Sequence, residues 1–200
     1  MNNNKMNYLN YINQILGYWF RDDIKKFWFN KNSFRIDSEI TKKFKFILIE
    51  AEKGNTVEWL MNKDSYLAHI ILMDQFSRHI YRNTPDAYKN DNKALFFMEM
   101  GLDFHLDKFS AEEKMFVLMP YQHTTNLECQ EIGIKILKKL IKDEKNSKEK
   151  NILKKALFHQ IGHYRVIKKF NRFPKRNLIL ERIPTPEEVD YMDASENVPY

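Results

Sequence analysis

Cysteine, glycine and proline are scarce in this chain of 200 residues, and each shortage excludes a class of protein. The one cysteine, Cys129, excludes a disulfide framework and a zinc site built from several cysteines. Five glycines and six prolines exclude collagen-like and linker-rich architectures and argue against a glycine-rich phosphate loop. Since apolar residues still make up 43% of the chain, we expect a sizeable buried core.

Long hydrophobic runs are also missing. Apolar stretches such as residues 46–49 and 68–73, the second of which is interrupted by His69, are far shorter than the roughly 20 residues that span a bilayer. The first seven residues are polar and precede no signal-peptide core. We therefore expect a soluble, cytoplasmic protein without a membrane partner.

Apolar residues recur at spacings of three and four along most of the chain, which indicates helices. Helices are predicted over residues 9–20, 37–53, 64–81, 85–101, 110–120, 126–141 and 149–170, with a last short one from Thr185-Pro-Glu-Glu188. Asp37 is a candidate N-cap, while Gly54 and Gly101 are candidate stops. Ser110-Ala-Glu-Glu113 has the form of a capping box, and we expect Pro120 to end or interrupt the helix that it opens.

No stretch alternates apolar and polar residues for long enough to predict a sheet. We therefore predict an all-α protein, with residues 1–200 forming a single helical domain. Within it, we expect residues 1–7 to form a polar N-terminal tail and residues 193–200 to form an acidic C-terminal tail.

The positive charge of the chain, +6 in total, is concentrated near its C-terminal end. Between Lys135 and Arg182, sixteen Lys and Arg face four acidic residues. Such a block attracts polyanions, but lysine is also the ordinary solvent-facing residue of a helix, and we favour a solvated face for residues 138–155. We expect no specific nucleic-acid binding, because no reading element or stacking platform is evident.

Asp74, Arg78 and Arg82 follow one another at steps of four, so they continue the apolar stripe of the predicted helix over 64–81. Charges on a buried face must be compensated. Residue types leave two alternatives open: an internal ion-pair network, or a pocket floor where the arginines receive an anion.

The predicted helix over 149–170 carries His159 and His163 on one face. That spacing can chelate a metal, but no cysteine or motif glutamate accompanies it, so we favour histidines of the core or its rim and expect no metal and no cofactor. Gly162 costs about 1 kcal/mol relative to alanine inside a helix, and this predicts the close approach of another element or a ligand.

Two further segments carry polar side chains. In Phe170-Asn-Arg-Phe-Pro-Lys-Arg-Asn177, the cations Arg172, Lys175 and Arg176 form either a phosphate-binding elbow or a helix end that complements its dipole. In residues 120–130, His123 and Glu128 are a candidate acid–base pair. Capping by Thr125 or Asn126 explains part of that segment, and Cys129 is expected to be a small core residue.

These segments belong to a series of motifs by which the chain resembles domain-of-unknown-function family 924, which is tetratricopeptide-like and all-helical. The series comprises Leu16-Gly-Tyr-Trp-Phe20, Trp28-Phe29, Met73-Asp-Gln-Phe76 with Arg78 and Arg82, Gly101-Leu-Asp103, Pro120 with His123 and Glu128-Cys-Gln130, His163, Phe170 with Arg172-Phe-Pro174 and Arg176-Asn177, and Thr185-Pro-Glu-Glu188. The resemblance implies a stack of about seven to eight antiparallel helices and soluble intracellular members, without implying an activity.

The chain departs from the family pattern at several positions. Ser77 and His79 stand where the pattern has proline and asparagine, and Thr125 replaces an acidic residue after His123. Asn171, Lys175 and Glu181 replace glycine, histidine and glycine. The change at Thr125 weakens a mechanism built on a His–Glu pair, whereas the arginines of the pattern are retained.

We therefore expect a positively charged internal pocket for a small phosphorylated or carboxylated ligand. Its predicted lining is Asp74, Arg78, Arg82, His123, His163, Arg172 and Arg176. One alternative is a hydrolase that uses the same pocket, with His123 or His163 as general base and Asp74 or Glu128 orienting it. Another is a tetratricopeptide-like scaffold that binds a peptide.

Overall fold

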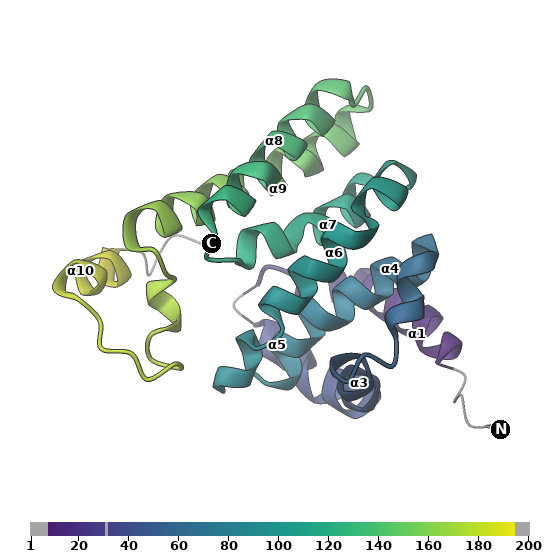
Figure 1. Ribbon diagram of the computed structural model, residues 1–200, viewed down its shortest axis with the longest axis horizontal. Coiled ribbons are helices and arrows are strands. Elements are labelled where there is room, and N and C mark those ends of the chain that lie inside the picture. Colours follow the sequence, from purple (N-terminus) through teal and green to yellow (C-terminus); the bar gives the residue numbers. More distant parts are fainter. Residues whose placement is uncertain (1–7, 31, 195–200) are drawn as a thin grey trace. The chain divides into compact units, whose positions relative to one another are not determined.

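The computed structural model describes residues 8–30 and 32–194, and over these ranges the chain forms helices joined by short loops, without a strand (Figure 1). The all-α prediction is confirmed. Backbone contacts group the chain into two compact units. Unit 1 comprises the described residues up to Arg82 together with Asp86–Lys108, and unit 2 comprises Asn83–Pro85 and the described residues from Phe109 onward.

Unit 1 is built around one long buried helix. Its elements are α1 (Leu9–Trp19), α2 (Asp22–Lys25), α3 (Asp37–Glu52), α4 (Lys63–Ile70), a π-helical segment (Ile71–Phe76), α5 (Ser77–Ile80) and α6 (Asp91–His105), with short 3-10 turns at Ser33–Ile36, Val57–Met61 and Leu106–Lys108.

The helix predicted over 64–81 is formed by α4, the π-helical segment and α5 in continuous succession. It is buried on nearly every side because α1, α3 and α6 pack around it. The ring of Phe76 lies 5.4 Å from that of Trp19 on α1 and 4.8 Å from that of Phe44 on α3. The widening of this helix into a π-helix, a feature often found at functional sites, was not predicted.

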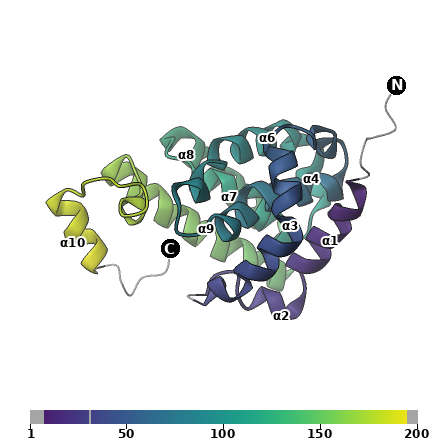
Figure 2. The same ribbon diagram turned by 90° about the horizontal axis from the view of Figure 1, so that it is seen from below.

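Helices α1 and α3 run antiparallel, as Figure 2 shows. Near the start of α1, Tyr8 donates to Glu50 at the end of α3, whereas Tyr18 at the end of α1 donates to Glu39 at the start of α3. Gly54, with a φ of 87°, ends α3 as predicted.

Two predictions for unit 1 were wrong. Asp37 does not cap α3 through its side chain but is its first residue. Gly101 does not end a helix, because α6 begins at Asp91 and continues to His105. A side chain at Gly101 would overlap the ring of Tyr66, so the glycine lets α4 and α6 approach closely. The hydroxyl of Tyr66 donates to the backbone of α6 at Met98.

Unit 2 contains α7 (Ala111–His123), α8 (Leu127–Asp143), α9 (Ser147–Phe170), a 3-10 turn (Pro174–Arg176) and α10 (Pro186–Ala194). Helices α8 and α9 form an antiparallel hairpin, and α7 packs against both (Figure 1). The capping box of Ser110 and Glu113 is confirmed, and Asn126 caps α8. Thr185 and Glu188 exchange the hydrogen bonds of a second capping box.

Two predictions for unit 2 were wrong. Pro120 neither ends nor breaks α7, which continues to His123. Gly162 is exposed, and a Cβ there would meet no atom within 4 Å. Asp193 and Ala194, the first two residues of the predicted acidic tail, belong to α10, and the rest of that tail, residues 195–200, lies outside the described residues, as does the predicted N-terminal tail of residues 1–7. None of the described helices is both long and apolar enough to span a membrane.

His69 on α4 is completely buried, and neither of its ring nitrogens has a hydrogen-bond partner. Its ring lies between those of Trp59, 6.4 Å away, and Phe97, 4.8 Å away. Burial lowers the pKa of His69 to about 4, because the charged form loses its hydration.

This pKa predicts a loss of stability in acid. Between pH 6.5 and 4 the unfolded chain binds more protons at this residue than the folded chain does. The free energy of unfolding therefore falls by up to about 3 kcal/mol as the pH falls through that window. Urea unfolding of wild type and His69→Phe at pH 7 and pH 4 measures the effect. We expect a smaller fall in the variant, whereas a His159→Phe control keeps the full fall. Equal falls in wild type and His69→Phe would contradict this assignment.

Candidate functional site

In unit 1, the structure places Asp74 and Arg78 in one ion-pair network. Asp74 lies in the π-helical segment with its side chain fully buried, and Gln75 donates to its carboxylate. The Nη2 atom of Arg78 lies 2.7 Å from Asp91 on α6 and 3.5 Å from Asp74. Although burial alone would lower the pKa of Arg78, the two carboxylates raise it, so the guanidinium stays charged. Its Nε atom is buried without a hydrogen-bond partner.

Arg82 belongs to a second cluster in unit 1. It binds both oxygens of Asp37 at the start of α3 and donates to Ser33 over 3.2 Å. The Nδ1 atom of His79 lies 2.7 Å from the same carboxylate. Burial favours the protonated acid, but the hydrogen bonds from His79 and Arg82 outweigh it and hold the pKa of Asp37 below its usual value.

Sequence reasoning missed this cluster. It treated Asp37 as a helix cap and His79 only as a departure from the family pattern. The two residues are 42 positions apart, so no local spacing signals their contact. Arg78 and Arg82 thus both form internal ion pairs, one of the two alternatives that the residue types left open, while their binding of a ligand stays a prediction.

The network around Arg78 predicts a large effect of its removal. Arg78→Met leaves Asp74 buried without its main cation and should lower the free energy of unfolding by about 3–5 kcal/mol. Chemical denaturation measures this loss, with Lys45→Met, an exposed lysine on α3, as the control. Adding Asp91→Asn to Arg78→Met should cost less than Asp91→Asn costs alone. A loss below 1 kcal/mol would show that the pairs are not structural.

In unit 2, side chains satisfy the backbone carbonyls at the end of α7. Gln130 on α8 donates to the carbonyls of Gln122 and Thr124 over 3.1 and 2.9 Å. Gln160 on α9 donates to the carbonyl of Tyr121 over 3.3 Å and to the side chain of Gln130 over 3.1 Å. Both glutamines are completely buried. The last carbonyls of a helix have no partner within it, so these contacts fix α7 against the α8–α9 hairpin.

Gly133 makes this contact possible. A Cβ at this position of α8 would lie 2.8 Å from the Cβ atom of Tyr121 and 3.2 Å from the Oε1 atom of Gln160. The close approach that the sequence predicted at Gly162 therefore occurs at Gly133 instead.

We expect Gln130→Leu to destabilise the chain by about 2–3 kcal/mol, because the carbonyl of Thr124 loses its donor and the carbonyl of Gln122 keeps only His163. Gln14→Leu, an exposed glutamine on α1, is the matched control. Thermal unfolding of both variants checks the difference, and an unchanged melting temperature for Gln130→Leu would contradict the role of the network.

Two predicted histidines and one predicted arginine gather at the same end of α7. The Nδ1–H group of His163 donates to the carbonyl of Gln122 over 2.8 Å. Arg176 donates to the carbonyl of His123 over 3.2 Å. The rings of His123 and His163 lie 5.9 Å apart. The ring of Phe173 lies 5.5 Å from that of His163, and the Arg176 guanidinium lies 4.3 Å from the centre of Phe173. We call His123, His163, Phe173 and Arg176 the His–Arg cluster.

Arg172 binds partners outside this cluster. Its guanidinium binds both carboxylate oxygens of Glu188 on α10 and donates to the carbonyl of Ile183 over 3.1 Å. Hydrogen bonding by Arg172 is the main cause that lowers the pKa of Glu188 to about 2. Asn177 also donates to Glu188, which is only 2% exposed. Arg172 therefore fixes the start of α10.

The other candidates of unit 2 lie nearer the surface. Glu128 is exposed in the first turn of α8, and His159 is half-buried on α9. Among the described residues, no three His, Cys, Asp or Glu side chains are placed to share a metal ion. Catalysis by His123 or His163 stays a prediction.

Most of the chain matches a known protein family. The model of a family described as "Bacterial protein of unknown function (DUF924)" matches residues 15–196. The chain belongs to the DUF924 family. A solved structure of a protein of unknown function from Agrobacterium tumefaciens is similar to it, with a TM-score of 0.80 and 26% identity over 94% of this chain and 99% of that one. No curated protein matches the chain.

The structure explains how this DUF924 chain accommodates two of its departures from the family pattern. Ser77, which stands in place of proline, donates its hydroxyl to the carbonyl of Met73 over 2.6 Å. His79, which stands in place of asparagine, forms the contact with Asp37. Thr125, which replaces an acidic residue, is exposed.

Proposed function

We infer that this DUF924 protein binds a small phosphorylated or carboxylated ligand at the His–Arg cluster. The observation that carries this proposal is the gathering of two imidazoles and one guanidinium: His163 and Arg176 lie against the ring of Phe173, and the ring of His123 lies beside that of His163. Three groups that can each bear a positive charge lie together there, and a guanidinium matches phosphate and carboxylate oxygens in pairs.

The contacts with α7 support the proposal by fixing the donors in place. His163 donates from Nδ1 to a carbonyl, so its Nε2 atom is the one that faces away from α7. The Arg176 side chain is held by the carbonyl of His123 and by the face of Phe173, and a guanidinium carries its five N–H groups in a rigid planar fork. Side chains that are ordered before binding lose less entropy when a ligand arrives.

The charge of the surrounding segment supports the same class of ligand. Residues 135–182 carry a local charge of +12, which raises the concentration of small anions near the cluster.

A thermal-shift assay with inorganic phosphate, phosphate monoesters and dicarboxylates tests this function. A ligand at 100 times its Kd should stabilise the wild type by about 2.7 kcal/mol, or about 5–10 °C. Arg176→Met and His123→Ala should each abolish most of this shift. Arg165→Met removes the same charge from an exposed position of α9 and should keep it.

The ligand-free melting temperatures separate binding from folding. Arg176→Met removes the hydrogen bond to the carbonyl of His123 and the contact with the Phe173 ring, so the ligand-induced shift of each variant is measured from its own ligand-free melting temperature. An equal ligand-induced shift in the wild type and both cluster variants, or no shift with any anion, would contradict the proposal.

A further inference from the structure

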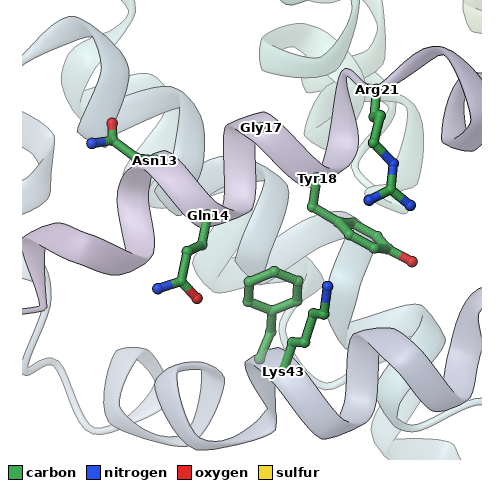
Figure 3. A pocket seen from close by; sticks show the side chains of 7 residues that line it. Asn13, Gln14, Gly17, Tyr18, Arg21 and Lys43 are labelled. Carbon is green, nitrogen blue, oxygen red and sulfur yellow. The ribbon is translucent and has the colours of Figure 1, made fainter.

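Helices α1 and α3 of unit 1 border a pocket of about 240 Å³, shown in Figure 3. Its lining comes from one side of α1, from Arg21 just after α1, and from Lys43 and Phe44 on α3. It contains none of the residues of the His–Arg cluster or of the two ion-pair networks. Its volume is below the roughly 300–1,000 Å³ of drug-sized sites, and so suits a smaller metabolite.

One end of the pocket is cationic and aromatic. The Cζ atom of Arg21 lies 5.3 Å and the Nζ atom of Lys43 lies 5.2 Å from the centre of the Tyr18 ring. Figure 3 shows this ring between the ends of the two side chains. Two cations thus converge on one aromatic group that is itself almost completely buried.

The carboxylates that pair with these two cations are exposed, so another anion can compete with them. Arg21 pairs with Asp23, and Lys43 pairs with Glu39. All four side chains are between 41% and 57% exposed. Exposed ion pairs contribute little to stability, so an anion that touches both cations at once can replace the carboxylates. The hydroxyl of Tyr18 donates to Glu39, and burial raises the pKa of this phenol, which keeps it protonated.

The other end of the pocket is polar but uncharged. The exposed side-chain amides of Asn13 and Gln14 supply donors and acceptors one turn before Gly17 and Tyr18 on α1. Gly17 leaves the wall between the two ends open, since a Cβ at this position would meet no atom within 4 Å. The pocket therefore passes from amides, over a bare helix backbone, to an aromatic ring with two cations.

We propose that this pocket is a second binding site, for a small molecule with a phosphate or carboxylate group at one end and hydroxyl groups at the other. The anionic group contacts Arg21 and Lys43 beside the ring of Tyr18. The hydroxyl groups bond to Asn13 and Gln14, and the carbon chain lies along Gly17 and Phe44.

Isothermal titration with three probes tests this site. Glycerol 3-phosphate supplies the phosphate, glycerate supplies a carboxylate, and glycerol supplies hydroxyl groups alone. We expect saturable binding of at least one of the two anions and none of glycerol. The stronger anion identifies the charged group. Failure of both anions to bind at 10 mM, on the order of ten times a millimolar Kd, would overturn the proposal.

Two substitutions locate the binding. Gly17→Met fills the pocket from within α1, and methionine is favoured over glycine inside a helix, so the fold is retained. It should weaken binding at least tenfold, as should Lys43→Met. Gly162→Met is the matched control, because Gly162 also lies in a helix with open space at its Cβ position. Undiminished binding by Gly17→Met would overturn the proposal.

The same titrations separate this site from the His–Arg cluster. Arg176→Met should retain the binding that Gly17→Met loses. Anion binding that is lost in Arg176→Met and kept in both Gly17→Met and Lys43→Met would belong to the His–Arg cluster, and the pocket between α1 and α3 would then bind no anion.

Discussion

The backbone carbonyls at the end of α7 need donors, and this need organises unit 2. The carbonyls of the last residues of a helix have no partner within it, and leaving them buried without one costs stability. Gln130, Gln160, His163 and Arg176 supply the donors from α8, α9 and the following turn. The same contacts bring two histidines and an arginine together, so the candidate site is a consequence of how α7 ends.

The charged residues of unit 1 form two kinds of ion pair, buried and exposed. Arg78 and Arg82 hold the long central helix to α6 and α3 through buried or half-buried carboxylates. A buried ion pair is costly to break, although its formation contributes little net stability. Arg21 and Lys43 instead have exposed partners that an anion can displace. In unit 1, ligand binding is therefore better supported at the pocket between α1 and α3 than at the buried arginines.

Glycines inside the helices have two opposite surroundings, close packing or open space, and the sequence does not distinguish them. At Gly101 and Gly133 the missing side chain admits a neighbouring tyrosine, and a larger residue would force the helices apart. At Gly17 and Gly162 the same lack leaves open space. A glycine inside a helix signals only that a side chain is dispensable there. What occupies the vacated volume depends on the helix packed opposite.

The sequence by itself determined the helices and most of their ends, because periodicity and caps such as Ser110 and Asn126 act within a few residues. The tertiary structure alone decided the partners of the polar side chains. Asp37 meets Arg82 across 45 positions, and Gln122 meets His163 across 41. Side chains so far apart in the chain meet only where packed helices place them, and spacing along one helix carries no information about that packing.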